Sequence, residues 1–291
     1  MEHIFGDWMS DEFPEQTRDR DRGYHYRDLS TGKSVAKSWT ENDFRHQTRV
    51  RVLCDPCNSD SGATLESKVE PVLRPMLRGN GAIVSPDKGS ALSTWATKVA
   101  VLWEFLDPAE ARIIPDWYRY SLRENTQPPP KTLVLAGWLM EGSWSHRAQQ
   151  VNLVIGHRAV AAANAIGTGQ APSTRPENAF LSVLGFRRIF FLVAAVLSDD
   201  HFEPFDFSQF GEQLFARLWP DPEPFFWPRL APAPDQLLDR FVGNPDVFFR
   251  IPPGADVSGV PGLDLTSTPA PPRTPAPPPS RKRKRKRRKG R

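Results

Sequence analysis

Two cysteines three positions apart, Cys54 and Cys57, are the residues of this chain best suited to holding a metal ion. The spacing Cys-x-x-Cys places two thiolates on one tight turn, where they can supply half of a tetrahedral zinc site. A structural zinc needs four ligands, and His25 and His46 are the other candidates in the same segment. A pair of reduced, partly buried thiols fits this spacing equally well. A redox dithiol fits less well, because the cysteines do not open a helix in a strand–helix–strand pattern.

A second group of residues could carry hydrolytic chemistry: Glu2 and His3 at the start, Asn58 directly after Cys57, and Glu66 eight residues later. Phosphodiester hydrolysis with one metal ion needs a ligand for a divalent cation and a general base that deprotonates water near neutral pH. It also needs hydrogen bonds that fix the orientation of that base. An acidic residue beside a histidine, followed by a Cys-Asn turn and a helix with a further ligand, can supply all three.

The segments Glu2-His3-Ile4-Phe5, Val52–Asn58 and Leu65-Glu66 resemble the HNH nucleases, whose ββα-metal motif is named for His-Asn-His. The resemblance implies that Glu2 and Glu66 bind a catalytic Mg²⁺ or Mn²⁺. It implies that His3 is the general base and that Asn58 stabilises the loop that aims it. Cys54 and Cys57 would belong to a structural zinc site. This resemblance covers roughly residues 1–75.

A bacterial and phage branch of HNH-like proteins shares a longer pattern with this chain, including a Trp-Ala-x-Lys helix that corresponds to Trp95–Lys98. Members with a Cys pair before the Asn usually carry another upstream of the acidic-His pair, whereas this sequence begins at Met1. We therefore expect either two further ligands upstream or an incomplete zinc site. Two alternatives stay open: a catalytically degenerate HNH fold that binds nucleic acid, and a non-enzymatic module that binds another protein.

The C-terminal end is a run of basic residues behind a segment rich in proline. The chain has a formal net charge of +4, and ten basic residues after position 280 contribute +10, which leaves −6 on the remainder. Such a run binds phosphates with strong salt dependence, so we expect nucleic acid, double-stranded DNA in particular, as the partner. The predicted nucleic-acid-binding residues are Arg281, Lys282, Arg283, Lys284, Arg285, Lys286, Arg287, Arg288 and Lys289.

The patterns of apolar residues predict an α+β fold with an N-terminal ββα-metal motif. We expect this motif in residues 1–80 with a polar surface loop at 14–50, a helical segment at 81–127, a mixed strand and helix region at 128–253, and a disordered tail at 254–291. Expected helices are 63–77, interrupted at Pro71 and Pro75, then 90–106, 113–124, 210–218 and 235–242. Expected strands are 48–53, 132–139, 149–155, 180–184 and 189–197.

The apolar run from Phe180 to Leu197 is the strongest candidate for a membrane span. Arg187 and Arg188 lie near its middle, and each would cost about 2.5 kcal/mol at the centre of a bilayer. We therefore interpret the run as core segments and expect no membrane partner. The start of the chain has no basic and apolar signal pattern, so a cytoplasmic, nucleoid-associated location is expected.

Overall fold

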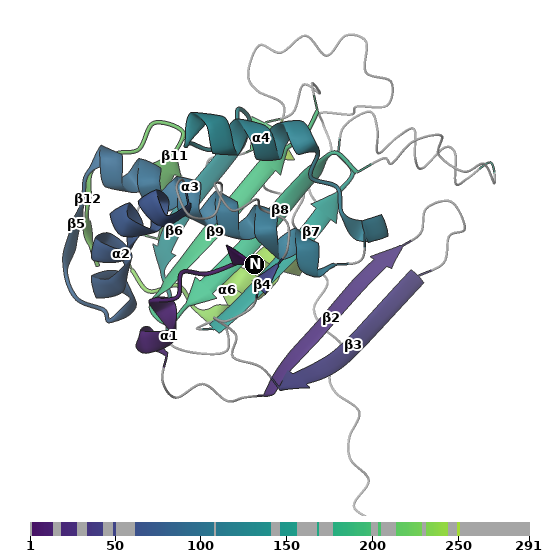
Figure 1. Ribbon diagram of the computed structural model, residues 1–291, viewed down its shortest axis with the longest axis horizontal. Coiled ribbons are helices and arrows are strands. Elements are labelled where there is room, and N and C mark those ends of the chain that lie inside the picture. The colour runs from purple at the N-terminus through teal and green to yellow at the C-terminus, as the bar shows by residue number, and fades with distance from the viewer. Residues whose placement is uncertain are drawn as a thin grey trace, which may run out of the picture.

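The centre of the molecule is a five-stranded antiparallel sheet (Figure 1). Its strands are β6 (Thr132–Trp138), β7 (His146–Leu153), β8 (Ala179–Phe186), β9 (Ile189–Val196) and β11 (Ala216–Trp219), in the order β11-β6-β9-β8-β7. The computed structural model describes residues 2–13, 19–27, 34–42, 49–50, 62–107, 109–140, 146–155, 168, 177–198, 203–204, 214–228, 231–243 and 249–250. The α+β fold class is confirmed, and four of the five strands fall where the sequence predicts strands.

Strands β8 and β9 are buried on both faces, which explains their continuous apolar sequence. Alternate side chains enter two separate clusters: Phe180 and Leu184 lie in one, while Leu181 and Val183 lie in the other. This is the period of two that a strand imposes. Arg187 and Arg188 form the two-residue turn between β8 and β9, so the apolar run is a hairpin. None of the described helices is long and apolar enough to cross a membrane.

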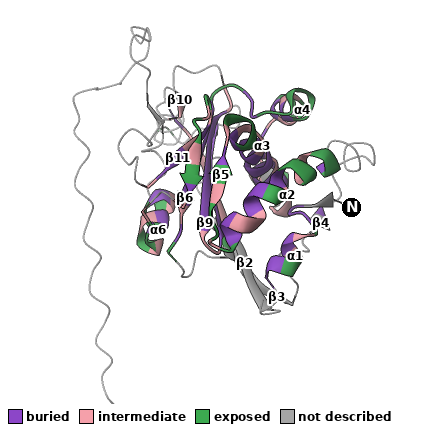
Figure 2. Ribbon diagram, turned by 90° about the vertical axis from the view of Figure 1, so that its left-hand side faces the viewer, coloured by how far each residue is buried: buried purple, intermediate pink, exposed green. Residues whose placement is uncertain are grey.

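Helices cover both faces of the sheet (Figure 2). The larger layer contains α2 (Ala63–Leu77), α3 (Pro86–Trp103) and α4 (Asp116–Asn125), with short 3₁₀ turns η3 (Glu104–Leu106) and η4 (Ala109–Ala111) between the last two helices. On the opposite face, α6 (Asp235–Gly243) buries Leu238 and Phe241 in the second cluster. The predicted helices 90–106, 113–124 and 235–242 correspond to α3, α4 and α6.

Helix α2 runs unbroken through Pro71 and Pro75, although the sequence predicts interruptions there. Each proline removes a backbone donor, at a cost of about 3 kcal/mol in a helix interior. Burial of Val69, Val72, Leu73, Met76 and Leu77 against the core offsets that cost. The helix ends at Leu77 and is followed by Gly79, whose φ of +74° favours glycine, while the N–H of Asn80 donates to Pro75 O at 2.9 Å.

Two predictions of local structure are wrong. The range 14–50 contains a hairpin of β2 (Asp19–Arg27) and β3 (Ser34–Asn42) where a loop was expected. Alternating charge is a pattern of period two, so it suits a strand as well as a solvated loop. The predicted helix 210–218 overlaps β11, in which Ala216 and Leu218 are buried while Arg217 and Trp219 are half-buried. This alternation is that of a strand.

Three two-stranded pairings complete the described elements. Strand β1 (Glu2–His3) pairs with β4 (Arg49–Val50), β5 (Ala82–Val84) pairs with β12 (Phe225–Trp227), and β10 (Glu203–Pro204) pairs with β13 (Phe249–Arg250). A short helix, α1 (Met9–Glu12), follows β1. One apolar cluster includes Ile4, Leu73, Trp95, Phe191 and Trp227, so the three ordered segments expected from the sequence contribute to a common core.

Candidate functional site

The start of the chain lies beside residues that are almost fifty positions away. Strand β1 is antiparallel to β4, with Glu2 opposite Val50 and His3 opposite Arg49. Helix α2 follows β4 in the chain and contacts α1. The order of elements from the start of the chain is therefore β1, α1, β2, β3, β4 and α2, so a short helix and the β2–β3 hairpin separate the paired strands β1 and β4.

Packing of Ile4 and Phe5 attaches this first strand to the sheet. Both side chains are buried, and the Phe5 ring meets the Phe186 ring edge-on at a centroid distance of 5.4 Å. Trp95 of α3 packs against the same Phe186 ring at 5.8 Å. The backbone that carries Glu2 and His3 is thus continuous with a fixed part of the core.

Glu66, in the first turn of α2, lies at the junction of three segments. Its Oε2 accepts a hydrogen bond from Trp8 Nε1 at 2.9 Å, and its Oε1 accepts one from Trp95 Nε1 at 3.0 Å. Lys98 Nζ lies 3.6 Å from the same Oε1. The Glu66 side chain is 16% exposed, so its charge is mostly removed from water but stays accessible. Two indole donors and one ammonium compensate this partial burial.

Gly6 brings the chain that leaves β1 directly onto the Glu66 carboxylate. A Cβ placed on Gly6 would overlap Glu66 Oε2 and Trp8 Nε1, so only glycine permits this approach. Gly6 is three residues beyond His3, and three residues span at most roughly 11 Å. The Glu66 carboxylate is therefore close to the end of the strand that holds the predicted general base.

A second carboxylate, Glu12, fixes the segment around Trp8 from the other side. Its buried side chain accepts hydrogen bonds from Arg78 Nε at 2.8 Å and from Arg74 Nη1 at 2.5 Å. The Arg78 hydrogen bond is the main cause that lowers the pKa of Glu12, and the charges of Arg78 and Arg74 add to it against the opposing effect of burial. The Arg74 guanidinium also lies 5.3 Å from the Trp8 ring centroid. Trp8 is thus held between two residues of α2, Glu66 and Arg74.

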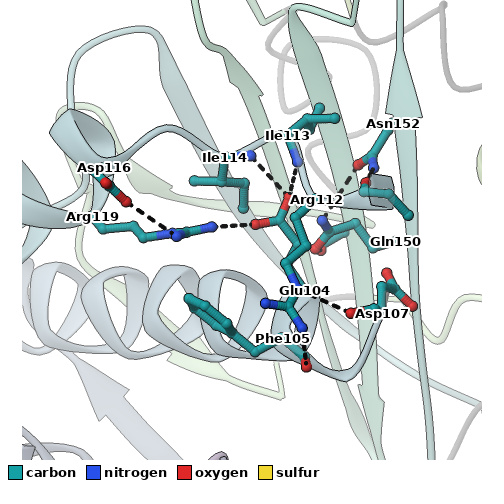
Figure 3. Close-up of polar contacts among 12 residues, drawn as sticks. Glu104, Phe105, Asp107, Arg112, Ile113, Ile114, Asp116, Arg119, Gln150 and Asn152 are labelled. Atoms are coloured by element: carbon teal, nitrogen blue, oxygen red, sulfur yellow. Dashed lines mark hydrogen bonds and ion pairs between the residues drawn. The ribbon is translucent and has the colours of Figure 1, made fainter. Parts of the chain in front are cut away.

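Glu104, at the end of α3, is a fully buried carboxylate with a different role (Figure 3). Its Oε1 accepts the backbone N–H groups of Ile113 and Ile114, and its Oε2 accepts Arg119 Nη2 at 2.6 Å. The Arg119 guanidinium stacks 4.4 Å from the Phe105 ring centroid. These bonds fix the connection between α3 and α4 and compensate the negative charge of Glu104. We therefore assign Glu104 a structural role.

The structure places only some of the residues predicted from the sequence. Glu66 is described with its side chain, whereas Glu2 and His3 are described by their backbone pairing. Cys54, Cys57, Asn58 and residues 281–289 lie outside the described residues. Among the residues that are described, no three His, Cys, Asp or Glu side chains gather as a metal site.

Sequence reasoning missed the residues that surround Glu66. Trp95 lies in the expected helix 90–106 and is fully buried, and its indole also donates to Glu66. Trp8 and Lys98 are 58 and 32 positions from Glu66, so no local spacing links them to it. A buried indole needs a hydrogen-bond acceptor, so a tryptophan in an apolar helix stripe is the sequence signal that predicts a polar partner nearby.

Comparisons with protein-family models, with curated proteins and with solved structures found no match for this chain.

Proposed function

We propose that this protein is an HNH-type endonuclease that hydrolyses phosphodiester bonds of DNA with the help of a divalent metal ion. The observation that carries the proposal is the contact between Glu66 and Gly6. It brings a carboxylate of α2, the helix that follows β4, against the chain that leaves the Glu2–His3 strand, which pairs with β4.

Glu66 has the chemistry that a hard divalent cation prefers. A carboxylate offers about four lone-pair sites, and the hydrogen bonds from Trp8 and Trp95 account for two of them, while Lys98 lies 3.6 Å away as an ion pair. The remaining sites are available to Mg²⁺ or Mn²⁺, which bind oxygen ligands and keep several waters. Glu2 would supply the second carboxylate. The bound ion would neutralise the charge that builds up on the phosphate and the leaving oxygen.

The roles of the chain's own residues in this proposal are those that the resemblance to HNH nucleases implies. His3 accepts a proton from the attacking water, for which an imidazole is suited near neutral pH. Asn58 holds the loop that orients His3. Trp8, Trp95 and Lys98 keep the Glu66 carboxylate in one orientation. Cys54 and Cys57 supply two ligands of a structural zinc, and the basic run 281–289 holds DNA through its phosphates.

The second candidate function is DNA binding by an HNH fold without catalysis. The same Glu66 contacts favour it, because a carboxylate held by two indole donors and one ammonium can serve the fold alone. Incubation of supercoiled plasmid with purified protein and Mg²⁺ or Mn²⁺ separates the two. The nuclease converts the plasmid to nicked circles, and the non-catalytic protein retards it on a gel without nicking it.

A further inference from the structure

A groove lies between α2 and α3 and reaches the end of α4. Its volume is about 950 Å³, and its polar lining residues are Thr64, Ser67, Lys68, Asp87, Lys88, Ser90 and Thr126. This volume is at the upper end of the usual range for ligand sites, and the groove is open to solvent, which suits a segment of a polymer.

The groove offers the groups that contact a phosphodiester backbone. Lys68 on α2 and Lys88 near the start of α3 are both exposed and lie on different elements of the groove. Lys88 uses one of its three protons to donate to Ile83 O at 3.2 Å, which leaves two for a ligand. Four hydroxyl side chains accompany the lysines, and Asp87 is the acidic residue among the lining residues. Lysine and hydroxyl groups are common phosphate contacts in protein–DNA complexes.

The position of the groove relates it to Glu66. Leu65 and Ser67, the neighbours of Glu66 in the chain, line the groove, while Glu66 itself faces Gly6 and Trp8. A strand that lies in the groove would therefore pass the helical turn that carries the proposed metal ligand.

Helix α4 is the element next to the groove that carries exposed aromatic rings. It ends next to Thr126, which lines the groove, and it exposes Trp117 and Tyr120 by 49% and 57%. Both α2 and α4 present exposed residues on the outer side of the helical layer (Figure 2). Exposed aromatic rings are the groups on which unpaired bases stack, and they favour nucleic acid over an acidic peptide as the occupant.

We propose that the groove between α2 and α3 is a track for one strand of nucleic acid, with its phosphates bound by Lys68 and Lys88. The inference rests on the proposed function, since it adds a substrate-binding surface to the helix that carries Glu66. It also assigns phosphate binding to the folded body of the protein, whose net charge without the basic run is negative.

Binding of a fluorescein-labelled DNA duplex and of the matching single strand tests the track, with full-length protein in a buffer without added Mg²⁺ or Mn²⁺ so that no metal-dependent cleavage occurs. Fluorescence anisotropy is measured at a series of salt concentrations for wild type, Lys68→Gln, Lys88→Gln and the double variant. Each lost phosphate contact lowers the slope of log K against log salt by about 0.9 for duplex DNA and about 0.7 for a single strand. We expect the slope of the double variant to fall by about 1.8 for the duplex and about 1.4 for the single strand, and its binding to weaken at least 10-fold at low salt.

Arg240→Gln is the matched control, because Arg240 is an exposed cation on α6, on the opposite face of the sheet. It should leave both slope and affinity unchanged, and the thermal melting of all variants should match wild type. Slopes of the double variant equal to those of wild type would show that the basic run makes the phosphate contacts and would overturn the track. Photocrosslinking from p-benzoylphenylalanine at position 67 gives a second measurement: the track requires a crosslink to DNA, and its absence contradicts it. Both measurements are independent of hydrolysis, so they distinguish failure of the track from failure of the nuclease proposal.

Discussion

The indole of Trp8 donates a hydrogen bond to the carboxylate of Glu66, 58 positions away in the chain, at 2.9 Å. This bond joins the segment after β1 to the first turn of α2. Because Trp8 is also held by Arg74, and Glu66 by Trp95 and Lys98, the start of the chain has a fixed position against the helical layer. Any chemistry at Glu2 and His3 depends on that position.

Replacement of Glu66 by Gln should destabilise the fold. The substitution keeps the size of the side chain but removes the charge and turns one acceptor into a donor that faces an indole N–H. Hydrogen bonds to charged groups contribute about 1.5–3 kcal/mol each, so we expect the free energy of unfolding in urea to fall by about 2 kcal/mol or more. Glu70→Gln on the same helix is the control: Glu70 pairs with Arg74 at the surface and should cost less than about 1 kcal/mol. Equal losses in the two variants would contradict the account.

Gly6→Ala tests the close approach of the backbone to Glu66. The added methyl group overlaps Glu66 Oε2 and Trp8 Nε1, so one of these side chains must move. Overpacking of this kind costs about 1–3 kcal/mol, measured as a lower midpoint of urea or thermal unfolding. Gly243→Ala is the matched control, because an added Cβ there has no atom within 4 Å. Its effect should stay within about 0.5 kcal/mol.

Ionised Glu12 should stabilise the folded protein, so the free energy of unfolding should fall as the pH becomes acidic. Its pKa is lowered in the folded protein, chiefly by the hydrogen bond from Arg78, while in the unfolded chain it is about 4.3. The stabilisation is therefore present above the unfolded pKa and is lost as the pH falls through the folded value. Glu12→Gln should lower the free energy of unfolding by about 1–3 kcal/mol at pH 7, and the difference from wild type should shrink below about pH 4. Glu223→Gln, at an exposed ion pair with Arg217, should show no such trend. A difference between wild type and Glu12→Gln that is constant with pH would exclude this role.

Glu104 and Asp116 both pair with Arg119, and substitutions of these two residues should lower stability by very different amounts. Glu104→Gln leaves Arg119 without its buried counter-charge and weakens the bonds to Ile113 and Ile114. Breaking one side of a buried ion pair costs about 3–5 kcal/mol, which urea unfolding would detect directly. Asp116→Asn removes the other partner of Arg119, at the surface, and should cost less than about 1 kcal/mol. The reverse order of the two losses would be inconsistent with the contacts described.

Much of the sheet and of the helical layer could be predicted from the sequence because the burial patterns are strong. The apolar stripe around Trp95 predicts α3, and the runs on both sides of Arg187 predict β8 and β9. The segment at Ala216–Trp219 was predicted incorrectly because a short apolar run fits a helix and a strand equally well. The start of α3 at Pro86 was missed because the apolar stripe begins only at Leu92.

The candidate site was only partly accessible to sequence reasoning. Glu66 could be selected from its place after the Cys-Asn turn, through a family resemblance. Its contacts with Trp8 and Lys98 could not, because they depend on how α1, α2 and α3 pack together. The approach of Gly6 is likewise a property of the tertiary structure.

The most direct test of the nuclease proposal is the rate at which supercoiled plasmid is nicked in Mn²⁺ by wild type and by His3→Ala. His146→Ala, which replaces a histidine on β7, is the control for both stability and activity. A general base contributes about 10²–10⁴-fold, so we predict that His3→Ala loses at least 100-fold in rate while His146→Ala nicks at the wild-type rate. Equal nicking by wild type and His3→Ala, or no metal-dependent nicking by wild type, would contradict the proposal.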